Sequence, residues 1–185
     1  WQLLVDPLDG SAVFAKGSKK WGSMVGATDL EGRLIFSWNI ISTGAVFTSE
    51  YSPILPLKSL KSKIDSGGKL RIDVFDYDAG ASEKIRPELE ATYGLKSDQL
   101  QITSGPSAVC TGWDIWRGLL DGLLWLPSIN GKKNYPGYDL IFLGALASAG
   151  YAVRLGKIGT AVNFVAVAPT NEDVETLYAI GLRQI

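Results

Sequence analysis

Apolar and polar residues alternate over several short segments in the first half of the chain, and turn-forming residues separate these segments. Alternation of this kind predicts β-strands. The turn Asp29-Leu30-Glu31-Gly32 predicts a hairpin between two of the strands. The strands expected in this half are residues 1–5, 22–28, 33–41, 45–48, 69–75 and 99–103. A short helix with Ser11 as its cap is expected over residues 11–16, and residues 49–68, which lack periodicity, are expected to be a surface connection.

Helical spacing of apolar residues dominates the second half of the chain. Helices are expected over residues 81–93, 107–120, 139–150 and 171–182, and strands over 123–126, 152–155 and 162–168. Antiparallel hairpins followed by strand–helix alternation predict a layered α/β (α+β) fold. The length of 185 residues is typical of one domain, so we expect a single domain over residues 1–185.

The composition excludes several kinds of chemistry. The chain has no histidine and a single cysteine, which rules out histidine-dependent triads, imidazole metal ligands and an intrachain disulfide. The 18 Lys and Arg residues nearly balance the 19 Asp and Glu residues, which argues against a nucleic-acid partner bound through bulk charge. No apolar run approaches the roughly 20 residues needed to span a bilayer, and no signal-peptide pattern is present. We therefore expect no membrane partner and a cytoplasmic location.

The strongest candidate for chemistry is a pair of acids in the segment Val5-Asp6-Pro7-Leu8-Asp9-Gly10-Ser11. Asp6 and Asp9 are three residues apart at the end of an apolar strand, and Pro7 restrains Asp6 to an extended conformation. Two carboxylates held together repel each other unless a cation joins them, and hard divalent cations prefer oxygen ligands. The carbonyl of Leu8 is a further candidate oxygen. The alternative interpretation is a surface turn with two solvated aspartates.

The residues that follow these acids predict an anion site. Gly10 allows the chain to bend closely around a ligand, and the amides of Gly10 and Ser11 open the expected short helix. A cation site next to an anion site indicates a phosphate ester as the ligand.

The segment WQLLVDPLDGSAVF resembles the W-x-x-D-P-[IL]-D-G-[ST]-x-x-F signature of the inositol monophosphatase family, whose members are magnesium-dependent, lithium-sensitive phosphomonoesterases. Residues 105–109 are similar to the family's G-[ST]-A-A segment, and Tyr138-Asp139 is similar to its later W-D element. The resemblance extends over essentially the whole chain. It implies alternating α and β layers of the inositol monophosphatase/fructose bisphosphatase type.

The resemblance also implies a metal site. Asp6, Leu8 through its carbonyl, Asp9 and Asp139 match the family's metal ligands. A complete site of this type holds two or three Mg²⁺ ions, which activate water for in-line attack on a small phosphorylated metabolite.

Four residues match positions around the substrate. Gly10 and Ser11 match the pair that holds the phosphate, and the Ser11 hydroxyl matches the group that helps to orient the water. Asp9 and Ser11 are therefore the expected catalytic residues. Ser107 and Ala108 match the region that borders the substrate.

The main departure from the family pattern lies before the first residue. The family's Gly-Glu-Glu element and its N-terminal helices precede the Asp-Pro motif, and this sequence begins at the motif with Trp1. We therefore expect an N-terminally truncated form of the fold, a fragment with an uncovered apolar face that favours a homodimer. The alternative is a truncated, catalytically incomplete phosphate- or metal-binding module.

Two further departures concern the substrate. Trp125 falls near the position of an acid that contacts substrate hydroxyls, which disfavours an inositol-like polyol. Residues 128–138 form a longer loop that carries Lys132, Lys133 and Tyr135; we expect a solvated surface loop, and a contact to a second phosphate is the alternative.

Overall fold

The computed structural model describes residues 1–50, 56–75, 80–105, 107–126, 135–158 and 161–184. Contacts group the chain into two compact units. The first unit comprises Trp1–Leu55, Gly105–Gly118 and Pro136–Gly150, and the second comprises Pro56–Ser104, Leu119–Tyr135 and Tyr151–Ile185. The single domain expected from the length stays a prediction.

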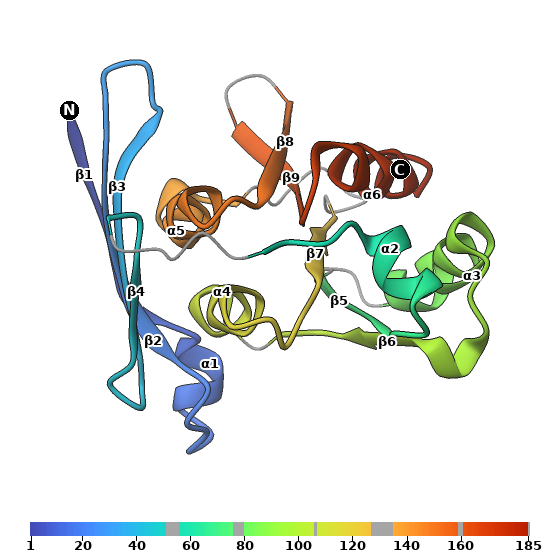
Figure 1. Ribbon diagram of the computed structural model, residues 1–185. Coiled ribbons are helices and arrows are strands. Elements are labelled where there is room, and N and C mark those ends of the chain that lie inside the picture. Colours follow the sequence, from blue (N-terminus) through green and yellow to red (C-terminus); the bar gives the residue numbers. More distant parts are fainter. Residues whose placement is uncertain (51–55, 76–79, 106, 127–134, 159–160, 185) are drawn as a thin grey trace. The chain divides into compact units, whose positions relative to one another are not determined.

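The first unit is built on an antiparallel four-stranded sheet in the order β1-β2-β3-β4 (Figure 1). Its strands are β1 (Gln2–Asp9), β2 (Gly22–Thr28), β3 (Leu34–Ile41) and β4 (Val46–Thr48). The helical segments of this unit are α1 (Ser11–Phe14), α4 (Ala108–Trp116), η2 (Gly137–Leu140) and α5 (Phe142–Ser148). Helices α4 and α5, which come from much later in the chain, pack against the same sheet.

Glycines allow α4 to approach its neighbours closely. A Cβ atom on Gly22 of β2 would lie 2.6 Å from Cγ1 of Val109, and a Cβ on Gly112 would lie 2.4 Å from Cδ2 of Phe142 in α5. Neither distance is compatible with a methyl group in close-packed protein. The approach brings the start of α4 against the sheet, next to the end of β1.

The opposite face of the sheet carries exposed apolar side chains. The register aligns Val5, Val25 and Trp38 across three strands, so they share one face. Leu3 is 60% exposed, Val5 is 47% exposed and Trp38 is 43% exposed. This face agrees with the expectation of an uncovered apolar surface.

The second unit is built on a five-stranded sheet in the order β6-β5-β7-β9-β8, in which β5 is parallel to β6 and β7 and antiparallel pairing joins β7, β9 and β8. Its strands are β5 (Leu70–Phe75), β6 (Leu100–Thr103), β7 (Gly122–Trp125), β8 (Ala152–Ile158) and β9 (Ala161–Ala168). Its helical segments are α2 (Leu60–Asp65), α3 (Ala81–Tyr93), η1 (Ser97–Gln99) and α6 (Asn171–Leu182). The mixture of sheets and helices confirms the expected α+β fold class.

Several predicted elements are confirmed, but helix α2 was missed. Ser59 caps α2 by accepting a hydrogen bond from the Ser62 N–H at 3.1 Å, and Leu60 is fully buried. A helix of six residues is too short to show apolar periodicity, so the prediction of a plain surface connection was wrong there. Residues 51–55 of that segment lie outside the described part of the chain.

The boundaries of three elements near the candidate site also differ from the prediction. Strand β1 continues through Asp9 instead of ending at residue 5. Gly10, with φ of 81°, is the cap of α1, whereas Ser11 is its first helical residue. Asp139 lies in the 3₁₀ segment η2, because α5 begins only at Phe142. None of the described helices has the length and apolarity needed to cross a membrane.

Candidate functional site

The candidate site begins where β1 departs from regular pairing with β2. Asp6 pairs with Met24 and Asp9 with Gly22, and the register shifts between the two acids. Both carboxylates therefore face the side of the sheet that α4 and α5 cover, and they are only 9% and 7% exposed. The alternative of two solvated aspartates on a surface turn is wrong.

Hydrogen bonds hold the irregular segment between the two acids. The Ser23 hydroxyl donates to the carbonyl of Pro7 at 2.7 Å, and the Leu8 N–H donates to Oδ1 of Asp6 at 3.1 Å. These bonds replace part of the ladder that the register shift interrupts. Both bonds engage the Pro7–Leu8 peptide unit, which precedes the Leu8 carbonyl, and the pairing of Asp9 with Gly22 holds the chain after it.

Gly10 makes the turn that joins β1 to α1. Its φ of 81° is in the left-handed region, and a Cβ atom on it would lie 2.7 Å from Cβ of Ser107 and 3.1 Å from the carbonyl oxygen of Lys20. Glycine is thus required twice, for the backbone conformation and for the close approach of Ser107. Ser11 follows it and is exposed at the start of α1.

The Asp9 carboxylate accepts hydrogen bonds from the first residues of α4. The Val109 N–H donates to Oδ2 of Asp9 at 2.7 Å, and the Ala108 N–H and the Ser107 hydroxyl also bond to this carboxylate. The Ser107 Oγ accepts from the Cys110 N–H at 3.2 Å and so caps the helix. Together, Asp9 and Ser107 satisfy the amides that the beginning of a helix leaves without partners.

The three aspartates of the site influence one another electrostatically. Burial raises the pKa of Asp6, opposed by the hydrogen bond from Leu8, and burial raises the pKa of Asp9, opposed by the donors on α4. Burial, together with the negative charges of Asp9 and Asp6, raises the pKa of Asp139 to about 7. The structure therefore brings Asp139 within electrostatic reach of the other two acids, although more than 100 residues separate them in sequence.

The donor set fits a divalent cation in chemistry but is not fully assembled. Buried carboxylates that repel one another are what a hard cation would join. Within the described ranges, however, no three His, Cys, Asp or Glu side chains are close enough to hold an ion. Repulsion between carboxylates acts over longer distances than metal ligation. The aspartates can therefore raise one another's pKa values although no three of them in the described part of the chain are close enough to hold an ion.

The structure brings most of the predicted site residues together. Those grouped around the end of β1 and the start of α4 are Asp6, Leu8, Asp9, Gly10, Ser11, Ser107 and Ala108. Sequence reasoning missed the Val109 amide, which donates to Asp9 at 2.7 Å. No local signal marks such a backbone donor, because its role depends on packing between distant segments.

The predictions for the later loop have different outcomes. Tyr135 is 4% exposed, and its hydroxyl donates to the Leu126 carbonyl at 2.7 Å, so it was wrong to place it in a solvated loop. Trp125 is also buried, at 5% exposure. Lys132 and Lys133 lie outside the described residues.

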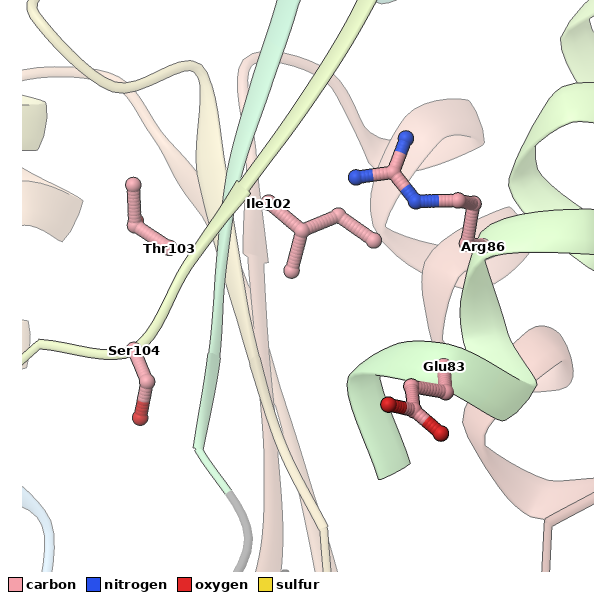
Figure 2. Close-up of a pocket in the computed structure, with 5 residues that line it drawn as sticks. All are labelled: Glu83, Arg86, Ile102, Thr103 and Ser104. Carbon is pink, nitrogen blue, oxygen red and sulfur yellow. The ribbon is translucent and has the colours of Figure 1, made fainter. Parts of the chain in front are cut away.

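The second unit contains a pocket of its own. It has a volume of about 220 Å³, and its lining residues are Glu83, Arg86, Ile102, Thr103 and Ser104. Figure 2 shows the Arg86 side chain, on α3, pointing toward Ile102 of β6. The Arg86 guanidinium donates to the Leu100 carbonyl at 3.2 Å and pairs with Glu90, and the Thr103 hydroxyl donates to Asp73. These polar groups already have partners within the fold.

Comparisons with known proteins find the same fold. No sequence model of a known family matches the chain, and no curated protein matches its sequence. Among solved structures, the extragenic suppressor protein SuhB from Bartonella henselae is similar, with a TM-score of 0.69 and 14% identity; the match covers 97% of this chain and 69% of that one. The inositol monophosphatase from Anabaena (Nostoc) matches with a TM-score of 0.66 and 16% identity, over 99% of this chain and 74% of that one.

A third similar structure is described as an IMPase/NADP phosphatase complexed with Mg²⁺ and phosphate. It has a TM-score of 0.61 and 13% identity, and the match covers 96% of this chain and 65% of that one. Identities at this level show a shared fold. The chain therefore has the fold of the inositol monophosphatase/SuhB-type proteins.

Proposed function

We propose that this protein belongs to the inositol monophosphatase family and is a Mg²⁺-dependent phosphomonoesterase that acts on a small phosphorylated metabolite. The observation that carries the proposal is the buried pair Asp6 and Asp9 at an irregular strand end, in a chain with the inositol monophosphatase fold. Solved proteins of this fold include one complexed with Mg²⁺ and phosphate, which supports the same ligand chemistry here.

In this proposal the aspartates bind the cation. Asp6, Asp9 and Asp139 supply carboxylate oxygens and Leu8 supplies its carbonyl, so that the cation balances the repulsion described above. When bound, a divalent cation supplies positive charge that acidifies water and stabilises the phosphoryl group during transfer. A complete site holds two or three such ions, in keeping with the motif resemblance.

The remaining residues of the turn bind and orient the substrate. The Gly10 and Ser11 amides hold phosphate oxygens at the tight turn, and the exposed Ser11 hydroxyl orients the attacking water. Ser107 and Ala108 border the leaving group, next to Gly10.

The experiment that tests the proposal is release of inorganic phosphate with and without Mg²⁺. The substrates are inositol phosphate, fructose bisphosphate, histidinol phosphate and a nucleotide bisphosphate. We expect turnover with Mg²⁺ and a loss of at least about 100-fold in Asp9→Asn, because this change removes a charge that contacts the cation. Asp98→Asn, at an exposed acid of the second unit, is the control and should keep full activity. No turnover of any ester, or unchanged turnover in Asp9→Asn, refutes the proposal.

A second candidate function is a phosphate- or metal-binding module without catalysis. It is favoured by the finding that no three acidic side chains converge on an ion position in the described residues. Binding of Mg²⁺ and phosphate without turnover of any ester would support this second function.

A further inference from the structure

Ser107 occupies the junction between the end of β1 and the start of α4. It is 6% exposed, and its Cβ lies 2.7 Å from the position that a Cβ on Gly10 would take. Its backbone is extended, and its side chain caps α4. The side chain is therefore enclosed between the turn that carries Asp9 and the helix itself.

Both hydrogen-bonding functions of the Ser107 hydroxyl are in use. The oxygen accepts from the Cys110 N–H at 3.2 Å, and the O–H donates to the Asp9 carboxylate. The Cys110 thiol is also within hydrogen-bonding reach of this hydroxyl, so its partners are groups of the protein itself. The arrangement distinguishes Ser107 from a residue that binds substrate through its side chain.

Asp9 is in turn held by three donors. The Val109 N–H approaches Oδ2 at 2.7 Å, and the Ala108 N–H and the Ser107 O–H complete the set. The two amides belong to the helix backbone and cannot be changed by side-chain substitution. Ser107 is thus the one member of this set whose contribution a mutation can remove.

We propose that Ser107 is a positioning residue that orients the Asp9 carboxylate for a divalent cation. The hydroxyl restricts rotation of the carboxylate and ties β1 to α4, as outer partners of metal ligands do in general. The cation part of this inference rests on the proposed function. The link between Ser107 and Asp9 does not, because it concerns the protein without metal.

The first test is a double-mutant cycle on the metal-free protein, with unfolding by urea as the measurement. Ser107→Gly removes the hydroxyl but keeps a residue that is tolerated as a helix cap. We expect Ser107→Gly to raise the equilibrium constant for unfolding about tenfold more in the wild-type background than in the Asp9→Ala background. Only in the wild-type background does the substitution remove a hydrogen bond to a charged group. If Asp9→Ala does not fold, Asp9→Asn serves as the background, with an expected coupling of about threefold.

The second test measures Mg²⁺ affinity by calorimetry. We expect Ser107→Gly and Ser107→Ala each to weaken binding about tenfold, within the range typical of outer-shell partners. Ser59→Ala is the matched control, since Ser59 caps α2 in the same way but has no part in the candidate site. It should lower stability and leave Mg²⁺ affinity unchanged.

The outcomes separate this inference from the proposed function. Equal effects of Ser107→Gly in both backgrounds overturn the inference, whether or not Mg²⁺ binds. Weaker binding in Ser107→Ala with normal binding in Ser107→Gly also overturns it, because the role is then helix capping alone. Coupling in the cycle, together with no Mg²⁺ binding to the wild type, leaves Ser107 linked to Asp9 and refutes the metal site.

Discussion

Replacing Asp139 by asparagine should stabilise the metal-free protein, and this stabilisation should increase with pH. The pKa of Asp139 is raised from 3.8 to about 7 by burial and by the charges of Asp9 and Asp6, so the folded state prefers the protonated acid. Below pH 4, Asp139 therefore does not lower the free energy of unfolding of the wild type. As the pH rises toward 7, this free energy of unfolding decreases. The Asp139→Asn variant carries a neutral amide at every pH, so it does not lose stability in this way.

The size of the effect follows from the same shift. A change from 3.8 to about 7 corresponds to about 4 kcal/mol if taken in full. Asp139 is only half-buried, and screening by water reduces this to about 1–2 kcal/mol at pH 8. Urea unfolding in the presence of EDTA at pH 5 and pH 8 measures it, with Asp98→Asn as the control. The stability difference between variant and wild type should widen by about 1 kcal/mol between the two pH values. A difference that is constant, or that narrows with pH, would show that burial and the other two acids do not raise the pKa of Asp139.

Two further predictions concern the turn and the exposed sheet face. Gly10→Ala should lower the free energy of unfolding by about 2–4 kcal/mol, because the new methyl group clashes with Ser107 and the residue also has a positive φ. Gly17 has a φ of 75° but no neighbour within 4 Å of a Cβ, so Gly17→Ala should lower the free energy of unfolding by only about 1 kcal/mol. Equal losses in urea unfolding would contradict the close approach. We also expect the protein to self-associate through its apolar sheet face, with Leu3→Asp shifting it toward monomer in sedimentation equilibrium. Leu30→Asp, at a leucine that is 85% exposed in the β2–β3 turn, should not do so, and a wild type that is monomeric at all concentrations would refute the homodimer.

Local pattern was sufficient for elements whose signals lie within a few residues. The hairpin of β2 and β3 followed from alternation and the turn Asp29-Leu30-Glu31-Gly32. The amphipathic helix α6 was also expected, with Asn171 or Thr170 as its cap, and Thr170 is the cap. Helix α2 is too short for periodicity, and its burial through Leu60 depends on partners elsewhere in the chain.

The candidate site shows the same limit more sharply. The proximity of Asp6 and Asp9 could be predicted because they are three residues apart in the sequence. Their burial could not be predicted, because it depends on the close approach of α4 to β2 at Gly22. The grouping of Ser107 with Asp9 joins segments about 100 residues apart. It was expected only through a family resemblance, and the hydrogen bonds that define it appear only in three dimensions.

The central claim is that the Asp6–Asp9 turn, held against the start of α4, binds a divalent cation. Calorimetric titration of Mg²⁺ into the wild type and Asp9→Asn tests it most directly. Saturable binding that weakens at least about 100-fold in Asp9→Asn is the predicted result, because the variant loses a charged ligand. Binding of equal affinity in both proteins, or no binding to the wild type, would contradict the claim.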